Sequence, residues 1–353
     1  MAADTELLEP DQLAGAPHPR EQMAFFGHAE GEAAFLDALA AQRLHHAWLI
    51  GGPEGIGKAT LAYRVARFLL AHGGAVPPGA TTLAVDSQHP AARQVAARSH
   101  PDLAVVRRGL RRDGKGYSQE IAVEHVRRAL DLFAATAGRG GYRVCIVDAA
   151  DDLNSSSGNA LLKVIEEPPP RSVFLVVSHA PQRLLPTIRS RCRKLQLRPL
   201  SEPDLRFVIR SLGPPFADTE EAELARAVGL AEGSVRRVIE MLDEDKAAIV
   251  AGTTALLAEL PRLDMRRVIQ LAEKVSPRGT EGDLQLALDT AMTWVSKGLE
   301  ERAVAGPARL APLVEVCEKV ARAAREAAVY NLDKRPVVIS LLGDLADAIR
   351  RTG

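Results

Sequence analysis

The chain has few cysteines and no excess of either charge. Its three cysteines are odd in number and far apart, which disfavours a disulfide framework and excludes a zinc site of four thiolates. Lys and Arg together number 45, as do Asp and Glu, so the formal net charge is zero. A neutral chain offers no overall attraction to nucleic acid or anionic lipid. Any contact with DNA must therefore be local or made through a partner.

Membrane and export signals are also missing. Apolar runs such as residues 174–177 are far shorter than the roughly 20 residues that a membrane span requires. The acidic start, residues 1–10, lacks the basic segment and apolar stretch of a secretory signal. We therefore expect a cytoplasmic protein without membrane contact. At 353 residues, 46% of them hydrophobic, the chain is long enough for roughly two or three globular domains.

Within the first 200 residues, segments that favour strands alternate with segments that favour helices. The strand segments are 46–51, 103–107, 142–148, 172–178 and 194–197, and the helical ones are 32–42, 58–71, 120–137 and 155–167. This alternation indicates right-handed crossovers and a five-stranded parallel sheet with helices on both faces. We predict a doubly wound α/β core over residues 1–200. Within it, residues 1–20 are expected to form a flexible leader, and residues 73–98 an insertion without regular structure.

After residue 200 the sequence favours helices alone. Residues 201–204, Ser-Glu-Pro-Asp, are typical of a helix start, with Pro in the first turn and carboxylates near the positive end of the helix. Residues 201–248 predict a small helical domain, and residues 249–353 a second all-α domain with longer amphipathic stretches. A stripe of apolar residues at helical spacing predicts core or helix-interface positions there: 310, 313, 314, 317, 320 and 321.

A glycine-rich segment lies between the first predicted strand and the helix that follows it. Gly52, Gly55 and Gly57 allow backbone N–H groups to converge on an anion. Lys58, at the start of the helix, would reach the terminal phosphates of a nucleotide. This order of strand, loop and helix indicates a loop of the nucleotide-binding type. The alternative is a tight structural turn with an exposed lysine.

Two residues that ATP hydrolysis requires are replaced by alanine. Ala59 stands where a Ser or Thr hydroxyl would bind Mg²⁺, and Thr60 lies about 100° further round the helix. Asp148, at the end of a predicted strand, could hold magnesium through water. The next residue, Ala149, cannot polarise an attacking water as a carboxylate would. ATP or ADP could still bind to Lys58 and the loop passively, with Mg²⁺ coordination impaired, and we expect no resident metal.

Four ordered blocks of the sequence resemble the AAA+ clamp-loader family of bacterial DNA polymerase III. They are residues 46–58, 141–151, 159–169 and 184–192. The third block reads NALLKVIEEPP and the fourth ends in SRC, and this combination is specific to the family. The resemblance implies an AAA+ P-loop core, a small helical lid and a helical collar. In the family, the collar joins subunits into an open five-membered ring.

The resemblance also implies roles for individual residues. Arg191 of the SRC motif would act in trans as an arginine finger on the nucleotide of a neighbouring subunit; otherwise it belongs to a solvated basic strand. Ser178 matches a first sensor of the terminal phosphate, or caps the segment that follows it. Arg236 matches a second sensor on the lid, or has a structural role. Glu166 and Glu167 point about 100° apart, so they indicate a helix end rather than a catalytic pair.

The partners implied are motor (gamma/tau) and delta subunits in a heteropentameric ring, with the sliding clamp and primer–template DNA contacted indirectly. We expect a non-hydrolysing arm that lends Arg191 to a motor subunit and assists clamp loading in DNA replication. The alternative is an ATP-hydrolysing motor subunit, in which Thr60 and another carboxylate fill the gaps. Family members often carry a four-cysteine zinc module, but residues 73–98 contain no cysteine, so no zinc is expected.

Overall fold

The structure is a computed structural model that describes most of the chain. The described residues are 8–111, 114, 116–134, 141–277, 281–302, 315–316, 319–320, 322–323 and 333–352. The chain forms two compact units, Met1–Ile239 and Glu240–Gly353, each with its own apolar core. The division into core, lid and collar at residues 200 and 248 stays a prediction.

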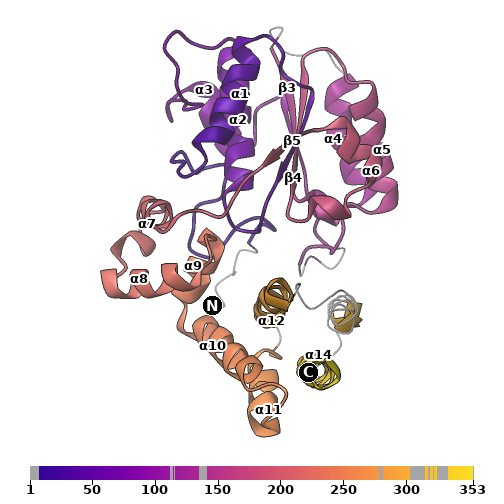
Figure 1. Cartoon of the computed structure of the whole chain (residues 1–353). Coiled ribbons are helices and arrows are strands. Elements are labelled where there is room, and N and C mark those ends of the chain that lie inside the picture. Colours follow the sequence, from indigo (N-terminus) through magenta and orange to yellow (C-terminus); the bar gives the residue numbers. More distant parts are fainter. Residues whose placement is uncertain are drawn as a thin grey trace. The chain divides into compact units, whose positions relative to one another are not determined.

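The first unit is built on a parallel sheet of five strands in the order β2-β3-β4-β1-β5 (Figure 1). The strands are β1 (Ala47–Gly51), β2 (Leu103–Val106), β3 (Arg143–Val147), β4 (Ser172–Ser178) and β5 (Arg193–Gln196). β1, β3 and β4 are buried along their whole length, as apolar strands covered on both faces must be. Gly51 pairs with Ser178, so the carboxyl ends of β1 and β4 lie level.

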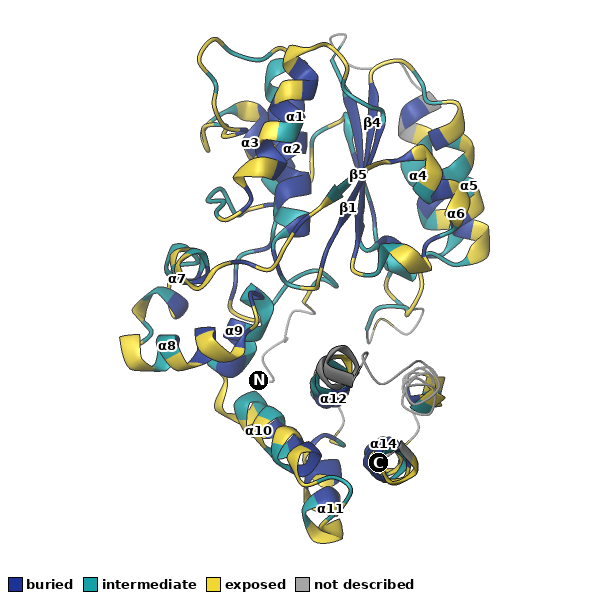
Figure 2. Cartoon of the chain, viewed as in Figure 1, coloured by how far each residue is buried: buried dark blue, intermediate teal, exposed yellow. Residues whose placement is uncertain are grey.

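Helices cover both faces of this sheet. On one face lie α1 (Ala29–Ala40), α2 (Lys58–His72) and α3 (Pro90–Ala96), and on the other α4 (Val123–Ala134), α5 (Ser155–Glu166) and α6 (Pro186–Arg191) (Figure 1). Successive residues of a strand point to opposite faces. Trp48 and Ile50 therefore join the core under α1 and α2, whereas Leu49 joins the core under α4, α5 and α6. Figure 2 shows β1 and β4 buried and the outer sides of these helices exposed, whereas the edge strand β5 is mostly exposed. The predicted α/β class is confirmed.

The segment 8–20, predicted to be part of a flexible leader, is bound to the core by ion pairs. Arg20 donates to both oxygens of the Glu9 carboxylate, at 2.8 and 2.9 Å. Arg107, just after β2, pairs with Glu9 and with Asp11. The acidic residues that suggested a solvated segment are thus held by arginines distant in sequence. The first seven residues of the predicted leader lie outside the described residues.

The predicted insertion 73–98 is only partly irregular. It contains α3, a helix of seven residues that starts with a proline, and Leu83 is fully buried in the core of the α2 face. The Leu83 N–H donates to the Glu32 carboxylate at 2.9 Å, and Glu32 also pairs with Arg64 at 2.5 Å. A buried ion pair and one apolar anchor therefore fix a segment whose composition alone suggested a loop.

Three short helices follow the sheet, and the last of them runs across the boundary between the two units. They are α7 (Glu202–Ser211), α8 (Glu221–Leu230) and α9 (Val235–Met241). Ser201 caps α7 by accepting a hydrogen bond from the N–H of Asp204, as the sequence predicted. The N–H of Leu200 donates to the carbonyl of Gly233 at 3.0 Å, which ties the start of α9 to the end of the sheet segment.

The second unit is helical, as predicted for this part of the chain. It comprises α10 (Glu244–Ala258), α11 (Met265–Lys274), α12 (Glu281–Arg302) and α14 (Arg335–Thr352). Trp294 of α12 packs against the core of this unit. Of the predicted apolar stripe, Val320 is buried, and the other five positions lie outside the described residues. Among the helices described, none has the length and apolar character needed to cross a membrane.

Candidate functional site

The glycine-rich loop connects the end of β1 to the start of α2. Gly52, Gly55 and Gly57 have φ angles of 144°, 76° and 94°, a region that residues with a Cβ rarely adopt. Gly57 immediately precedes α2, so the unpaired N–H groups of the first helical turn adjoin the loop. The three glycines are therefore needed for the shape of the loop. That the loop binds a phosphate stays a prediction.

Lys58 is the first residue of α2 and is 3% exposed. Its Nζ donates to the carbonyl of Pro53, within the loop. Burial lowers the pKa of Lys58 to about 8, although the carboxylates of Glu54, Asp148 and Asp151 act to raise it. The ammonium group thus lies inside the loop and near three acidic side chains.

The two alanines at the positions where the sequence predicts a loss of hydrolytic groups lie beside the predicted site residues. Ala59 is the second residue of α2, and the half-buried Thr60 is the third. Ala149 directly follows Asp148, at the point where the chain leaves β3 and enters a short 3-10 helix, Ala150–Asp152. The position next to Asp148 therefore offers neither a proton acceptor nor a metal ligand.

Asp148 is a buried carboxylate at the carboxyl end of β3. Its Oδ2 atom is buried and has no hydrogen-bond partner among the described residues. Burial raises the pKa of Asp148 to about 7, with a further rise from Asp11, whereas Lys58 lowers it. An ionised carboxylate without a donor is costly to bury. This oxygen is therefore suited to a cation or donor that a bound ligand would bring.

We predict that Asp148→Asn stabilises the first unit, and more so at pH 8 than at pH 5. The folded pKa of about 7 exceeds the unfolded value of about 4. The stability that proton binding gives is therefore complete below pH 4 and is lost as the pH rises to 7. Removing the carboxyl should raise the free energy of unfolding at pH 8 by about 1–3 kcal/mol, after allowance for relaxation around the site. Urea unfolding at both pH values measures this; an equal change at both would contradict it.

Asp151 is bonded to the turn that follows β4. Its carboxylate accepts hydrogen bonds from the Ser178 hydroxyl at 2.9 Å, from the His179 N–H at 2.7 Å and from the Ala180 N–H at 2.9 Å. With three donors bound, Asp151 is a poor replacement for the missing base next to Asp148. Ser178 is fully buried, and the N–H groups of the turn donate to Asp151 and not to the Ser178 hydroxyl. Its role as a phosphate sensor stays a prediction.

The amino end of α9 is bonded to the glycine-rich loop. The Ser234 hydroxyl donates to the carbonyl of Glu54, and the Val235 N–H to the carbonyl of Gly55, both at 2.9 Å. The Arg236 guanidinium lies 2.5 Å from the Glu54 carboxylate. Arg236 is therefore placed at the loop, as the resemblance implied, but its described partner is an acidic residue of the same chain. The second-sensor role stays a prediction.

Arg191, the predicted finger, lies away from the loop. It is the last residue of α6, and β5 then begins at Arg193, level with Trp48 near the start of β1. Its side chain is 40% exposed. Nη2 lies 2.8 Å from the Glu166 carboxylate, and Nη1 donates to the Thr187 carbonyl at 3.1 Å. The guanidinium is thus presented at the surface, near the amino end of β5, whereas the glycine-rich loop follows the carboxyl end of β1.

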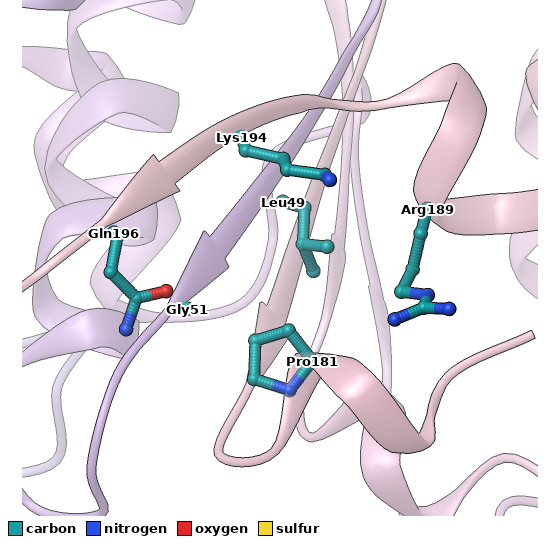
Figure 3. Close-up of a pocket in the computed structure, with 6 residues that line it drawn as sticks. All are labelled: Leu49, Gly51, Pro181, Arg189, Lys194 and Gln196. Carbon is teal, nitrogen blue, oxygen red and sulfur yellow. The ribbon is translucent and has the colours of Figure 1, made fainter. Parts of the chain in front are cut away.

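A cavity of about 90 Å³ lies beside β1 on the face covered by α6 (Figure 3). It is lined by Leu49, Gly51, Pro181, Arg189, Lys194 and Gln196. Leu49 belongs to the core under α4, α5 and α6, whereas the glycine-rich loop continues into α2 on the opposite face of the sheet. Ligand pockets usually measure about 300–1,000 Å³, so this cavity is too small for a nucleotide. It is distinct from the predicted phosphate site.

The structure therefore brings most of the predicted site residues together and leaves one apart. Those at the carboxyl edge of the sheet are Gly52, Gly55, Gly57, Lys58, Thr60, Asp148, Ser178 and Arg236. Sequence reasoning missed Glu54 as the partner of Arg236 and Glu166 as the partner of Arg191. An acidic residue inside a phosphate loop was the available signal for Glu54. Glu166 had none, because its partner lies 25 positions further along the chain.

Comparisons with known proteins bear on the family of the chain. The model of a family described as "DNA polymerase III, delta subunit" matches residues 27–201. DNA polymerase III subunit delta' of Pseudomonas aeruginosa is 35% identical over 216 residues, which cover 61% of this chain and 62% of that protein. Residues 27–201 of the chain therefore belong to this family of DNA polymerase III subunits. The predicted α/β core with helical regions after it is confirmed by the described strands and helices.

Other clamp-loader subunits show weaker similarity. Subunit delta' of Escherichia coli is 31% identical over 205 residues, covering 58% of this chain and 57% of that protein. Subunit tau of Escherichia coli is 29% identical over 277 residues, covering 77% of this chain and 40% of tau. The chain therefore spans about three fifths of its delta' relatives and two fifths of tau. The matched residues 27–201 include the sheet, the glycine-rich loop and Arg191.

Proposed function

We propose that this clamp-loader protein is a delta-prime-type subunit that does not hydrolyse ATP itself. It supplies Arg191 in trans to the ATP of a neighbouring motor subunit and assists loading of the sliding clamp in DNA replication. The proposed partners are motor (gamma/tau) and delta subunits in a heteropentameric cytoplasmic ring. The clamp and primer–template DNA would be contacted mainly through these partners, since the chain has no net charge.

The observation that carries this proposal is the contrast between the two ends of the sheet. At the carboxyl edge, Ala59 and Ala149 replace the magnesium ligand and the general base, and Asp151 already accepts three hydrogen bonds. At the other end, Arg191 holds a guanidinium at the surface. The chain therefore keeps a group that can act on another subunit's nucleotide while its own site lacks hydrolytic groups. The same contrast disfavours a motor subunit.

The action of Arg191 in trans follows from the charge of phosphoryl transfer. Negative charge spreads over the oxygens of the transferred phosphoryl group in the transition state. A planar guanidinium with several N–H donors stabilises that charge better than a single ammonium group does. Because Arg191 is at the surface and far from its own loop, the group it would serve must come from a neighbour. Hydrolysis would then depend on correct assembly.

The chain's own loop would retain ATP or ADP without turning it over. The bound nucleotide would supply the phosphate groups. The loop of Gly52, Gly55 and Gly57 would turn backbone N–H groups toward these phosphates. The positive charges of Lys58 and Arg236 would balance the phosphate charge. The loop fits such a group, because its glycines adopt backbone angles open to an anion and Lys58 lies within it. Ala59 has no hydroxyl to bind magnesium, and Ala149 has no carboxylate to act as a base.

We predict that the isolated chain does not hydrolyse ATP at a steady rate, with or without magnesium. The physical reason is that no proton acceptor stands beside Asp148, and general-base catalysis is worth about 10²–10⁴ in rate. The measurement is phosphate release from purified chain, with Lys58→Ala as the matched control for a contaminating ATPase. Turnover that requires magnesium and disappears in Lys58→Ala would overturn the proposal and favour a motor subunit.

A further inference from the structure

The finger arginine is held at a defined place by contacts within its own chain. Its Nη2 lies 2.8 Å from Oε1 of Glu166, and its Nη1 donates to the carbonyl of Thr187 at 3.1 Å. Glu166 is the last residue of α5, and Arg191 is the last residue of α6. A carboxylate and a main-chain carbonyl thus contact the two terminal nitrogens of the same guanidinium.

The two helices that carry this pair are fixed to one core. Ile165, next to Glu166, and Ile188, one turn before Arg191, are each 1% exposed in the core of the α4–α6 face. Cys192, directly after Arg191, is buried in the same core. The backbone of α5 is therefore anchored one residue from Glu166, and the backbone of α6 is anchored within one turn of Arg191. The carboxylate has a fixed position from which to orient a long, flexible side chain.

Orientation of this kind leaves donors available. A guanidinium has five N–H groups in a planar fork. The contact with Glu166 and the bond to Thr187 lie on its terminal nitrogens, and they fix the plane of the fork without using all five N–H groups. An arginine side chain has many rotamers, and fixing it beforehand reduces the entropy lost when it meets a ligand.

We propose that Glu166 is a positioning residue for Arg191. It holds the guanidinium in the orientation in which its remaining N–H groups can reach the phosphates of a neighbouring subunit's ATP. This inference rests on the proposed function in trans, and adds a residue that neither the sequence pattern nor the family resemblance assigned. Glu166 would touch no nucleotide and would act only through Arg191.

If Glu166 positions Arg191, then kcat of the loader should depend on an oxygen acceptor at residue 166. Both partners are 40% exposed, so the pair contributes little to folding stability. Glu166→Ala should therefore leave the unfolding temperature unchanged but lower kcat about three- to tenfold, with KM for ATP unchanged. Glu166→Gln retains an oxygen that can accept from Nη2, and should recover most of the lost kcat. If Glu166 instead competed with phosphate for Arg191, both variants would raise kcat.

The chain offers a matched control in the next residue. Glu167 is also exposed, follows α5 directly, and makes no ion pair within the part of the chain that the structure describes. Glu167→Ala removes the same charge from the same helix end. It should leave kcat and KM as they are. A fall in kcat equal to that of Glu166→Ala would mean that the charge of the region matters and not the contact with Arg191.

The experiment is a double-mutant cycle in a reconstituted loader. The loader is assembled so that the motor subunit beside this chain is its active ATPase, and kcat and KM are measured for Glu166→Ala, Arg191→Ala and the double variant. We expect Glu166→Ala to have no effect once Arg191 is alanine. An Arg191→Ala loss without any Glu166→Ala loss overturns the positioning role alone. No loss with Arg191→Ala overturns the proposed function, whatever Glu166→Ala does.

Discussion

Replacing Arg191 by alanine should lower the ATPase of the assembled loader by a factor on the order of 10² or more at the site that this residue serves. Arginine fingers contribute roughly 10³–10⁵ to kcat in other phosphoryl-transfer enzymes, and a multisubunit ring can retain part of that rate through other contacts. The side chain is 40% exposed and its described contacts lie at one helix end, so the variant should fold and assemble normally. The measurement is kcat in the loader with a single active motor subunit.

Two further variants sharpen this prediction. Arg191→Lys keeps the charge but loses the planar fork, so it should recover only a small part of the rate. Arg193→Ala removes a nearby cation whose guanidinium lies 4.6 Å from the centre of the Trp48 ring, directed at the chain's own core. It should leave loader turnover nearly unchanged. Full activity of Arg191→Ala in a loader of verified composition would refute the trans role.

Replacing Gly233 by alanine should destabilise the first unit by about 2–6 kcal/mol. Gly233 has a φ of 81°, which costs a residue with a Cβ about 1–3 kcal/mol. The added Cβ would also lie 2.7 Å from the backbone nitrogen and 2.9 Å from the carbonyl oxygen of Leu200, and overpacking costs about 1–3 kcal/mol more. Since the Leu200 N–H donates to the Gly233 carbonyl, the two backbone segments that meet here cannot move apart freely. Chemical unfolding of the chain measures the change.

The control for Gly233 is another glycine of the same small helical region. Gly229 lies within α8, and a Cβ added to it would meet no atom within 4 Å. Gly229→Ala should therefore be neutral or stabilising by up to about 1 kcal/mol, because alanine favours helices over glycine. If both substitutions had similar effects, the tight contact between Gly233 and Leu200 could not be the cause.

The sequence was sufficient to predict the layers of the first unit and which residues meet at the carboxyl edge of its sheet. Apolar strand segments separated by helices usually fold into a parallel sheet with right-handed crossovers. Residues that follow the carboxyl ends of such strands lie together at one edge of the sheet. This is why Lys58 and Asp148, 90 positions apart, could be assigned to the same place. The glycines of the loop could be identified because their backbone angles leave few other residues acceptable.

The remaining contacts depended on which charged side chains meet after folding. Composition suggested a loose leader, yet Glu9 and Asp11 meet Arg107 only because β2 ends beside the segment that carries them. Glu166 was correctly predicted to end a helix, but nothing in its local pattern revealed the contact with Arg191. Such pairings depend on rotamers and on distances across helices, which periodicity does not encode.

The division of the chain into two units, each with its own core, makes their folding separately observable. The sequence has two tryptophans, and each unit contains one: Trp48 is fully buried in the first, and Trp294 packs on the core of the second. Indole emission responds to loss of an apolar environment. Single Trp-to-Phe variants would therefore give one optical signal per unit, and coincident or separate melting transitions would tell whether the two cores unfold as one cooperative system.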